Sequence, residues 1–136
     1  MLMKAAMPTA VAALSALALA ACGSDSEASE ERENSTPAVA LQEAGETHAA
    51  LTAALATYKA GDHTAADDAV AEAYVQHFEE VEGPLGKKDA ELKEHLEEAI
   101  SADLRAAMKA GKPASEIEGE VNAIVTDLEK AEAALR

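Results

Sequence analysis

The sequence predicts an all-α fold, an up-down-up-down four-helix bundle that follows a signal peptide and a disordered tether. In residues 38–136, apolar side chains recur at i, i+3, i+4 and i+7, without the sustained alternation typical of strands. Turn signals near Gly61, Gly83-Pro84 and Gly111 divide this region into four helices. Each has about 18–23 residues, or about 30 Å at a rise of about 1.5 Å per residue. Matched lengths and short connections favour antiparallel neighbours.

The amino-terminal segment carries the most specific motif. A short start with Lys4 precedes an Ala/Leu/Val run that ends at Leu19-Ala20-Ala21-Cys22. A basic start, a short apolar stretch and small residues before a cleavage point are typical of a secretory signal. Leu-Ala-Ala-Cys resembles the bacterial lipobox, in which the cysteine is acylated and becomes the first mature residue. We expect residues 1–21 to be a lipoprotein signal peptide and Cys22 to carry lipid such as palmitate. The alternative is an ordinary signal peptide with an incidental cysteine.

Because Cys22 is the only cysteine, no disulfide can form within the chain. Once acylated, it cannot act as a nucleophile or a metal ligand, and more than one acyl chain makes anchoring stable. The lipidated cysteine and an acidic, flexible tether occupy residues 22–37, where Ser and Glu leave too little apolar surface for ordering. The sequence therefore predicts a helical domain, residues 38–136, that is extracytoplasmic (periplasmic or at the cell surface) and anchored to the cell membrane by lipid.

Local signals predict the first two helices. Thr36-Pro37 places an N-cap before a proline at the first helical position, and the helix runs to Lys59. Thr64-Ala65-Ala66-Asp67 resembles a capping box with Asp in place of Glu. It is expected to open a second helix that ends before Gly83-Pro84.

The third and fourth helices have comparable signals. Asp89 is an expected N-cap, with Glu91 in the first turn, and Gly111 ends the helix. Ser115 and Glu118 form an S-x-x-E capping box that is expected to open the last helix. The predicted inner stripes are Leu92, Leu96, Ile100, Leu104 and Ala107 on the third helix, and Ile117, Val121, Ile124, Leu128 and Leu135 on the fourth.

Three histidines fall near one level of the predicted bundle. At 100° per residue, His77 lies near the centre of the inner face of the second helix, with Phe78 on one flank and Glu80 at the opposite rim. His48 and His95 occupy inner or edge positions of the first and third helices. Imidazole and carboxylate ligands together suit iron, copper or zinc. The sequence thus predicts a metal site of His48, His77, Glu80 and His95. The alternative is that each histidine is a hydrogen-bonded core or boundary residue.

The excess of acidic over basic residues limits the classes of partner that the chain can bind. The formal net charge is −15, which argues against nucleic acid and against docking on anionic lipid, and favours cations, basic partners or plain solubility. Glu79 and Glu82 point outward on the second helix, as a solvated face or as a surface cation site. Asp103 falls on the inner face of the third helix, where a core hydroxyl or a cation is its expected partner.

No catalytic motif is recognisable. The sequence lacks a nucleophile elbow, a glycine-rich phosphate loop and zinc-ligand spacing. A di-iron bundle needs Glu-x-x-His on two helices, and no glutamate lies three residues before His77 or His95. We therefore expect a binding module and not an enzyme.

A series of short motifs runs through residues 50–135: a Gly-Asp turn, an Ala-Tyr pair, Phe-Glu-x-x-Glu, Leu-Glu, Leu-Arg and Lys-x-Gly. In this chain they are Gly61-Asp62, Ala73-Tyr74, Phe78-Glu79 with Glu82, Leu96-Glu97, Leu104-Arg105, and Lys109 with Gly111. With these motifs the segment resembles the extracytoplasmic helical domain that precedes the membrane part of bacterial high-affinity iron permeases, and it is loosely similar to imelysin-type iron-uptake lipoproteins.

The resemblance implies a setting in iron uptake, with Glu79 and Glu82 as the family-like acids. The chain lacks the spanning helices and the Arg-Glu-x-x-Glu motif of the permeases, so it does not transport iron alone. Two functions stay open. One is a membrane-anchored metal-binding accessory in iron uptake, whose partner is an iron permease or another envelope protein. The other is an acidic helical adaptor that docks an envelope protein without metal.

Overall fold

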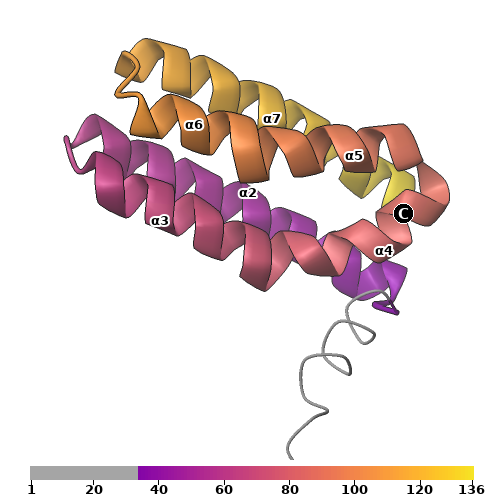
Figure 1. Cartoon of the computed structure of the whole chain (residues 1–136). Coiled ribbons are helices and arrows are strands. Elements are labelled where there is room, and N and C mark those ends of the chain that lie inside the picture. Colours follow the sequence, from indigo (N-terminus) through magenta and orange to yellow (C-terminus); the bar gives the residue numbers. More distant parts are fainter. Residues whose placement is uncertain (1–33) are drawn as a thin grey trace, which may run out of the picture.

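Helices alone make up the regular structure of residues 34–136, the part of the chain that the computed structural model describes (Figure 1). The helices form four arms. The arms are α2 (Pro37–Lys59); α3 (His63–Ala73), η1 (Tyr74–Phe78) and α4 (Glu79–Lys88); α5 (Ala90–Glu98), η2 (Ala99–Asp103) and α6 (Leu104–Lys109); and α7 (Ala114–Leu135). The predicted all-α class is confirmed for this region. The predicted signal peptide, residues 1–21, and Cys22 lie outside the described residues.

Two of the predicted helix starts are confirmed by their caps. Thr36 Oγ1 accepts a hydrogen bond from the amide of Val39 at 3.2 Å, ahead of Pro37 in the first turn of α2. Asp89 Oδ1 accepts one from the amide of Leu92 at 3.0 Å and starts α5. Each cap satisfies an amide that has no partner inside its helix.

Two other predicted starts are wrong. Helix α3 begins at His63, because Asp62 Oδ1 accepts from the amide of Ala65 at 3.0 Å; the Thr64–Asp67 box does not cap it. Helix α7 begins at Ala114, and no side chain caps it. There the carbonyl of Pro113 accepts from the amides of residues 116 and 117, which leaves the predicted Ser115 box without a function.

The second arm does not end at Gly83-Pro84 as the sequence predicts. Helix α4 continues through Pro84 to Lys88, and a single extended residue, Asp89, makes the corner to α5. Proline removes one helical hydrogen bond. Burial of Pro84 and Leu85 against the other arms offsets this loss, since apolar burial stabilises by about 25 cal/mol per Å².

Each middle arm contains a π-helical turn, η1 or η2, which changes the register of its core residues. In the second arm the buried positions step from Ala73 to Phe78, five residues on, instead of three or four. The wide turn therefore moves Phe78 into the core, with no exposed surface, and moves His77 to the boundary. The prediction that His77 occupies the centre of the inner face is wrong for this reason, because a constant 100° per residue cannot represent a π turn.

In the third arm, η2 allows side chains spaced four residues apart to remain in the hydrophobic core. Leu96, Ile100 and Leu104 follow one another at i+4 and are all fully buried. In a regular helix each such step would drift by about 40°. The predicted stripe of this helix is confirmed except for Leu92, which is only partly buried, and every predicted residue of the α7 stripe is buried.

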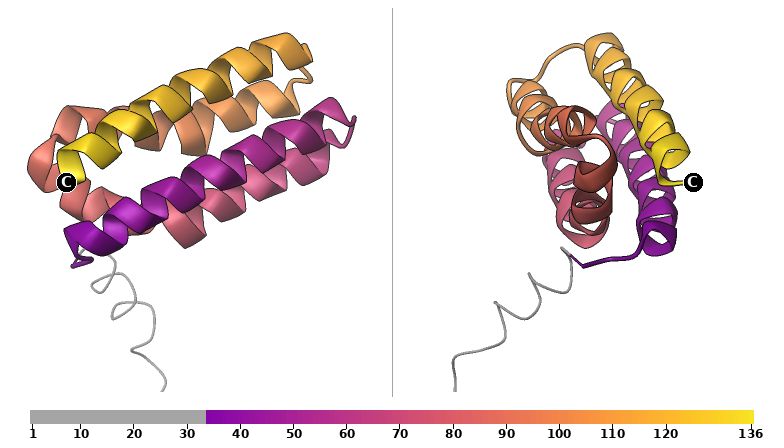
Figure 2. Two further views of the ribbon diagram at one scale, coloured as in Figure 1. Left: turned by 180° about the vertical axis from the view of Figure 1, so that it is seen from behind. Right: turned by 90° about the vertical axis from the view of Figure 1, so that its right-hand side faces the viewer.

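The arms pack around a thin core that contains many alanines. Helix α2 contacts α3, α4 and α7, while α6 lies against α3 and α5 against α4 (Figures 1 and 2). Consecutive arms are joined at alternate ends of the molecule (Figure 1). Helix α7 packs more closely on α2 than on the α5–η2–α6 arm. This uneven packing leaves one seam of the domain open, between the third arm and α7.

No helix in residues 34–136 has both the length and the apolar character needed to cross a membrane.

Candidate functional site

His77 lies at the boundary between the second arm and α2. Its Nδ1 is 2.7 Å from Glu43 Oε2, and the two side chains are 29% and 19% exposed. The contact joins η1 to α2 as a half-buried hydrogen bond, which becomes an ion pair when the imidazole is protonated. His77 therefore has a structural partner that the sequence did not reveal.

The other two predicted histidine ligands have surroundings different from those of His77. His95 is 67% exposed, and its Nε2 lies 3.2 Å from Asp127 Oδ2 of α7. His48 is partly buried on α2, because Thr47 takes the fully buried place on that face and donates to the carbonyl of Glu43 at 2.8 Å.

The predicted inner metal site is not assembled in this structure. Among residues 34–136, no group of three or more His, Cys, Asp or Glu side chains lies close enough to hold a metal ion. His48, His77, Glu80 and His95 are therefore not brought together. Nor does this part of the chain contain a buried side-chain nitrogen or oxygen without a hydrogen-bond partner.

The predicted surface acids belong to a cluster at the junction of the second and third arms. Tyr74 Oη donates to Glu82 Oε1 at 2.5 Å, and Lys93 Nζ donates to Glu97 Oε2 at 2.8 Å. Burial, then the charges of Glu97 and Glu79, raise the pKa of Glu82, while the Tyr74 bond and Lys93 oppose the rise. Glu82 thus pays an electrostatic cost that a bound cation or a basic side chain would relieve.

The same surroundings also shift the pKa values of Tyr74 and Lys93. Burial, the bond to Glu82 and the nearby carboxylates raise the pKa of Tyr74. The hydrogen bond to Glu97 raises the pKa of Lys93 against the effect of its burial. Glu79 also interacts within this region and is partly buried.

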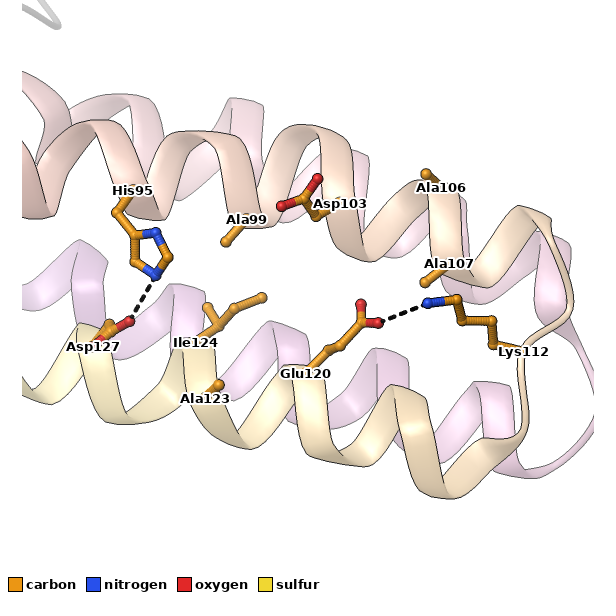
Figure 3. Close-up of a pocket in the computed structure, with 10 residues that line it drawn as sticks. All are labelled: His95, Ala99, Asp103, Ala106, Ala107, Lys112, Glu120, Ala123, Ile124 and Asp127. Carbon is orange, nitrogen blue, oxygen red and sulfur yellow. Dashed lines mark hydrogen bonds and ion pairs between the residues drawn. The ribbon is translucent and has the colours of Figure 1, made fainter.

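The open seam between the third arm and α7 forms a cleft of about 500 Å³ (Figure 3). Its apolar surface comes from Ala99, Ala106, Ala107, Ala123 and Ile124. Ion pairs cross the cleft toward its two ends: His95 with Asp127, and Lys112 Nζ with Glu120 Oε1 at 3.5 Å (Figure 3). A volume of this size lies within the range of about 300–1,000 Å³ of ligand sites.

Asp103 stands on the wall of this cleft, between the two ion pairs. The sequence placed it on the inner face of its helix, but its position at the end of η2 leaves it exposed. In the described part of the chain, no hydrogen bond or ion pair engages its carboxylate, whereas Glu120 and Asp127 each have a basic partner. The cleft therefore combines an apolar floor with one uncompensated negative charge.

Sequence reasoning missed the cleft and the partners of the histidines. Glu43 and Asp127 did carry a signal, because each precedes a buried residue, Ala44 or Leu128, and so lies at the edge of an apolar stripe. No sequence signal indicated the cleft, because the alanines that line it cannot be distinguished in the sequence from alanines of the core. Its position follows from how closely α7 approaches its neighbours.

No protein-family model, curated protein or solved structure matches this chain. The resemblance to the helical domain of iron permeases stays a prediction.

Proposed function

We propose that this protein is a membrane-anchored extracytoplasmic lipoprotein whose helical domain is an adaptor for a basic protein of the cell envelope. In this proposal, Cys22 and the acidic tether hold an up-down-up-down four-helix bundle, residues 38–136, near the membrane surface. The domain binds its partner without metal and without catalysis. The observation that carries the proposal is the open cleft beside α7, with its apolar floor and the uncompensated carboxylate of Asp103.

The histidine and acidic side chains already contact other side chains, and this favours docking of a protein over metal binding. His77 is hydrogen-bonded to Glu43, the imidazole of His95 lies 3.2 Å from the carboxylate of Asp127, and Asp67 is paired with Arg105. A metal would have to displace these partners, and its ligand imidazoles must be neutral. A docking partner can instead use surface that is already exposed, and the net charge of −15 favours a basic one.

The experiment is co-isolation of the lipidated protein with envelope proteins from its own cells, followed by reconstitution with the purified partner. The adaptor proposal expects a complex that persists in chelator and weakens as salt is raised, because salt screens charges on exposed surfaces. A complex that is lost on chelation, or that forms only after metal is added, overturns the proposal.

A second candidate is favoured by the acidic cluster at the arm junction. Tyr74, Glu79 and Glu82 of the second arm interact with Glu97 of α5, and burial with nearby negative charge raises the pKa of Glu82. Because residues 34–136 hold no preassembled group of three such ligands, a cation would be held at the surface by fewer of these carboxylates. Hard oxygen ligands suit ferric iron, and copper or zinc are the alternatives. In this version the protein is a cation-binding accessory in iron uptake, working beside a permease. Metal-dependent melting, described at the end of the Discussion, separates the two candidates.

A further inference from the structure

The cleft beside α7 is a shallow trough and not an enclosed pocket. Its floor is Ala107 and Ile124, each 4% exposed, while Ala106 and Ala123 on the walls are exposed. From His95 to Ala107 the third-arm wall extends for about 18 Å, at about 1.5 Å per residue. Small-molecule sites bury about 70–90% of their ligand. A long trough that is open on one side instead fits a ligand that presents only one of its faces.

We propose that this trough binds one amphipathic helix of an envelope protein, about three turns long, with a Lys or Arg positioned opposite Asp103. The inference rests on the proposed adaptor function and adds the binding surface and the chemistry of the partner. Helices that lie in apolar grooves use anchors at i, i+3, i+4 and i+7. The small side chains of Ala99, Ala106 and Ala123 allow the backbone of such a helix to approach closely, because side-chain size sets the distance between helix axes.

The charged side chains that line the trough favour one kind of ligand over others. Asp103, Glu120 and Asp127 line the trough, and only Glu120 and Asp127 have basic partners within residues 34–136. One cationic side chain at the level of Asp103 would complete the pairing. A second copy of this chain fits poorly, because two molecules of net charge −15 repel each other. Electrostatic complementarity of this kind determines which partners are rejected as much as it adds affinity.

The test uses the purified full-length chain and a fluorescent synthetic helix as the probe. The peptide has about 18 residues, with leucines at i, i+4, i+7 and i+11 and lysines along the flanks, the pattern that a groove-binding helix presents. A peptide of the same composition with the leucines scrambled is the control for general attraction between opposite charges. Fluorescence anisotropy gives the dissociation constant for each.

Variants of the trough are matched with variants on α3, which packs mainly on α2 and α6. Ala106→Trp fills the trough and should weaken binding of the amphipathic peptide at least tenfold. Asp103→Asn should weaken it about threefold to fivefold, as expected for one exposed charge pair. Ala65→Trp and Asp68→Asn replace exposed residues of α3 and should leave the dissociation constant within about twofold, the range of surface substitutions.

Four results overturn the inference. The first is equal binding of the amphipathic and scrambled peptides, or binding of the amphipathic peptide that Ala106→Trp does not weaken. The second is an equal loss in the α3 variants. The third is self-association of the chain that Ala106→Trp abolishes, which would assign the trough to a second copy. A salt-sensitive complex with an envelope protein that persists in Ala106→Trp would overturn this inference while leaving the adaptor function standing; absence of any such complex would remove the adaptor function itself.

Discussion

Arg105 Nε lies 2.9 Å from Asp67 Oδ1, and this ion pair joins α6 to α3 around an aspartate side chain that is only 10% exposed. The second guanidinium contact, from Nη2 to Oδ2, is 3.4 Å, and Lys109 Nζ is 3.6 Å from the same oxygen. A carboxylate at this depth needs such donors, because burial without them is costly. The pair engages the acidic residue of the predicted Thr64–Asp67 capping box, while Asp62 caps α3.

Replacing Arg105 with Ala should lower the free energy of unfolding by about 3 kcal/mol, since it leaves a buried carboxylate with only the more distant Lys109. Urea denaturation measures the loss. The matched control is Lys59→Ala, which breaks the exposed pair with Glu118 and should cost at most about 1 kcal/mol. Equal losses in the two variants would show that Asp67 does not depend on its pairing.

Deleting the exposed residue Gln76 should be tolerated, because it shortens the five-residue step between Ala73 and Phe78 to the four residues of a regular α turn. Phe78 would then stay in the core while η1 becomes α-helical. Deletion of exposed Ala53 in the regular helix α2 should instead rotate every following side chain by about 100° and lower the melting temperature sharply. Circular dichroism melting compares the two deletions. A similar loss in both would contradict the role given to η1.

The pH dependence of stability should reflect Glu82. Burial and the charges of Glu97 and Glu79 raise its pKa above the ordinary 4.5, so the folded protein holds this proton more tightly than the unfolded chain does. The stabilisation from the bound proton is therefore present below pH 4.5 and is lost as pH rises through the folded value. Glu82→Gln should flatten the profile just above pH 4.5 and increase stability at neutral pH. Urea denaturation at a series of pH values measures this, with the exposed Glu91→Gln as control; an unchanged slope in Glu82→Gln would contradict it.

Acylation of Cys22 is predicted from the sequence alone. Mass spectrometry of the mature protein should find a diacylated or triacylated cysteine as its first residue. Cys22→Ser should release or mislocalise the protein without changing its melting temperature, because the tether is not expected to contribute to the core. Cleavage at another position, or an unmodified Cys22, would contradict the lipoprotein assignment.

Most of the helix positions could be predicted because their signals are local. The caps at Thr36 and Asp89 and the glycines at 61 and 111 act within one turn of the chain, and both glycines have positive φ. The start of α3 was misplaced because Asp62 and Thr64 are both competent caps. In the structure Asp62 is the cap, and Asp67 pairs with Arg105 of a distant arm.

The candidate site could not be predicted to the same degree, because it depends on register and on packing. One π turn was enough to exchange the environments of His77 and Phe78, and no composition signal marks such a turn. The cleft depends on how far α7 lies from the third arm. The prediction that Asp103 faces the interior was wrong, and its position in the trough required the structure.

The measurement that tests the account most directly is thermal melting of the purified protein with ferrous iron, ferric iron, copper or zinc at stoichiometric concentrations. A ligand that binds only the native state raises the melting temperature by mass action. The adaptor account predicts no rise with any of these metals, in the wild type or in the variants. A rise that His77→Ala abolishes would establish the inner histidine site and contradict the account. A rise that survives His77→Ala but is lost when Glu79→Gln and Glu82→Gln are combined would contradict it in favour of the surface cation site.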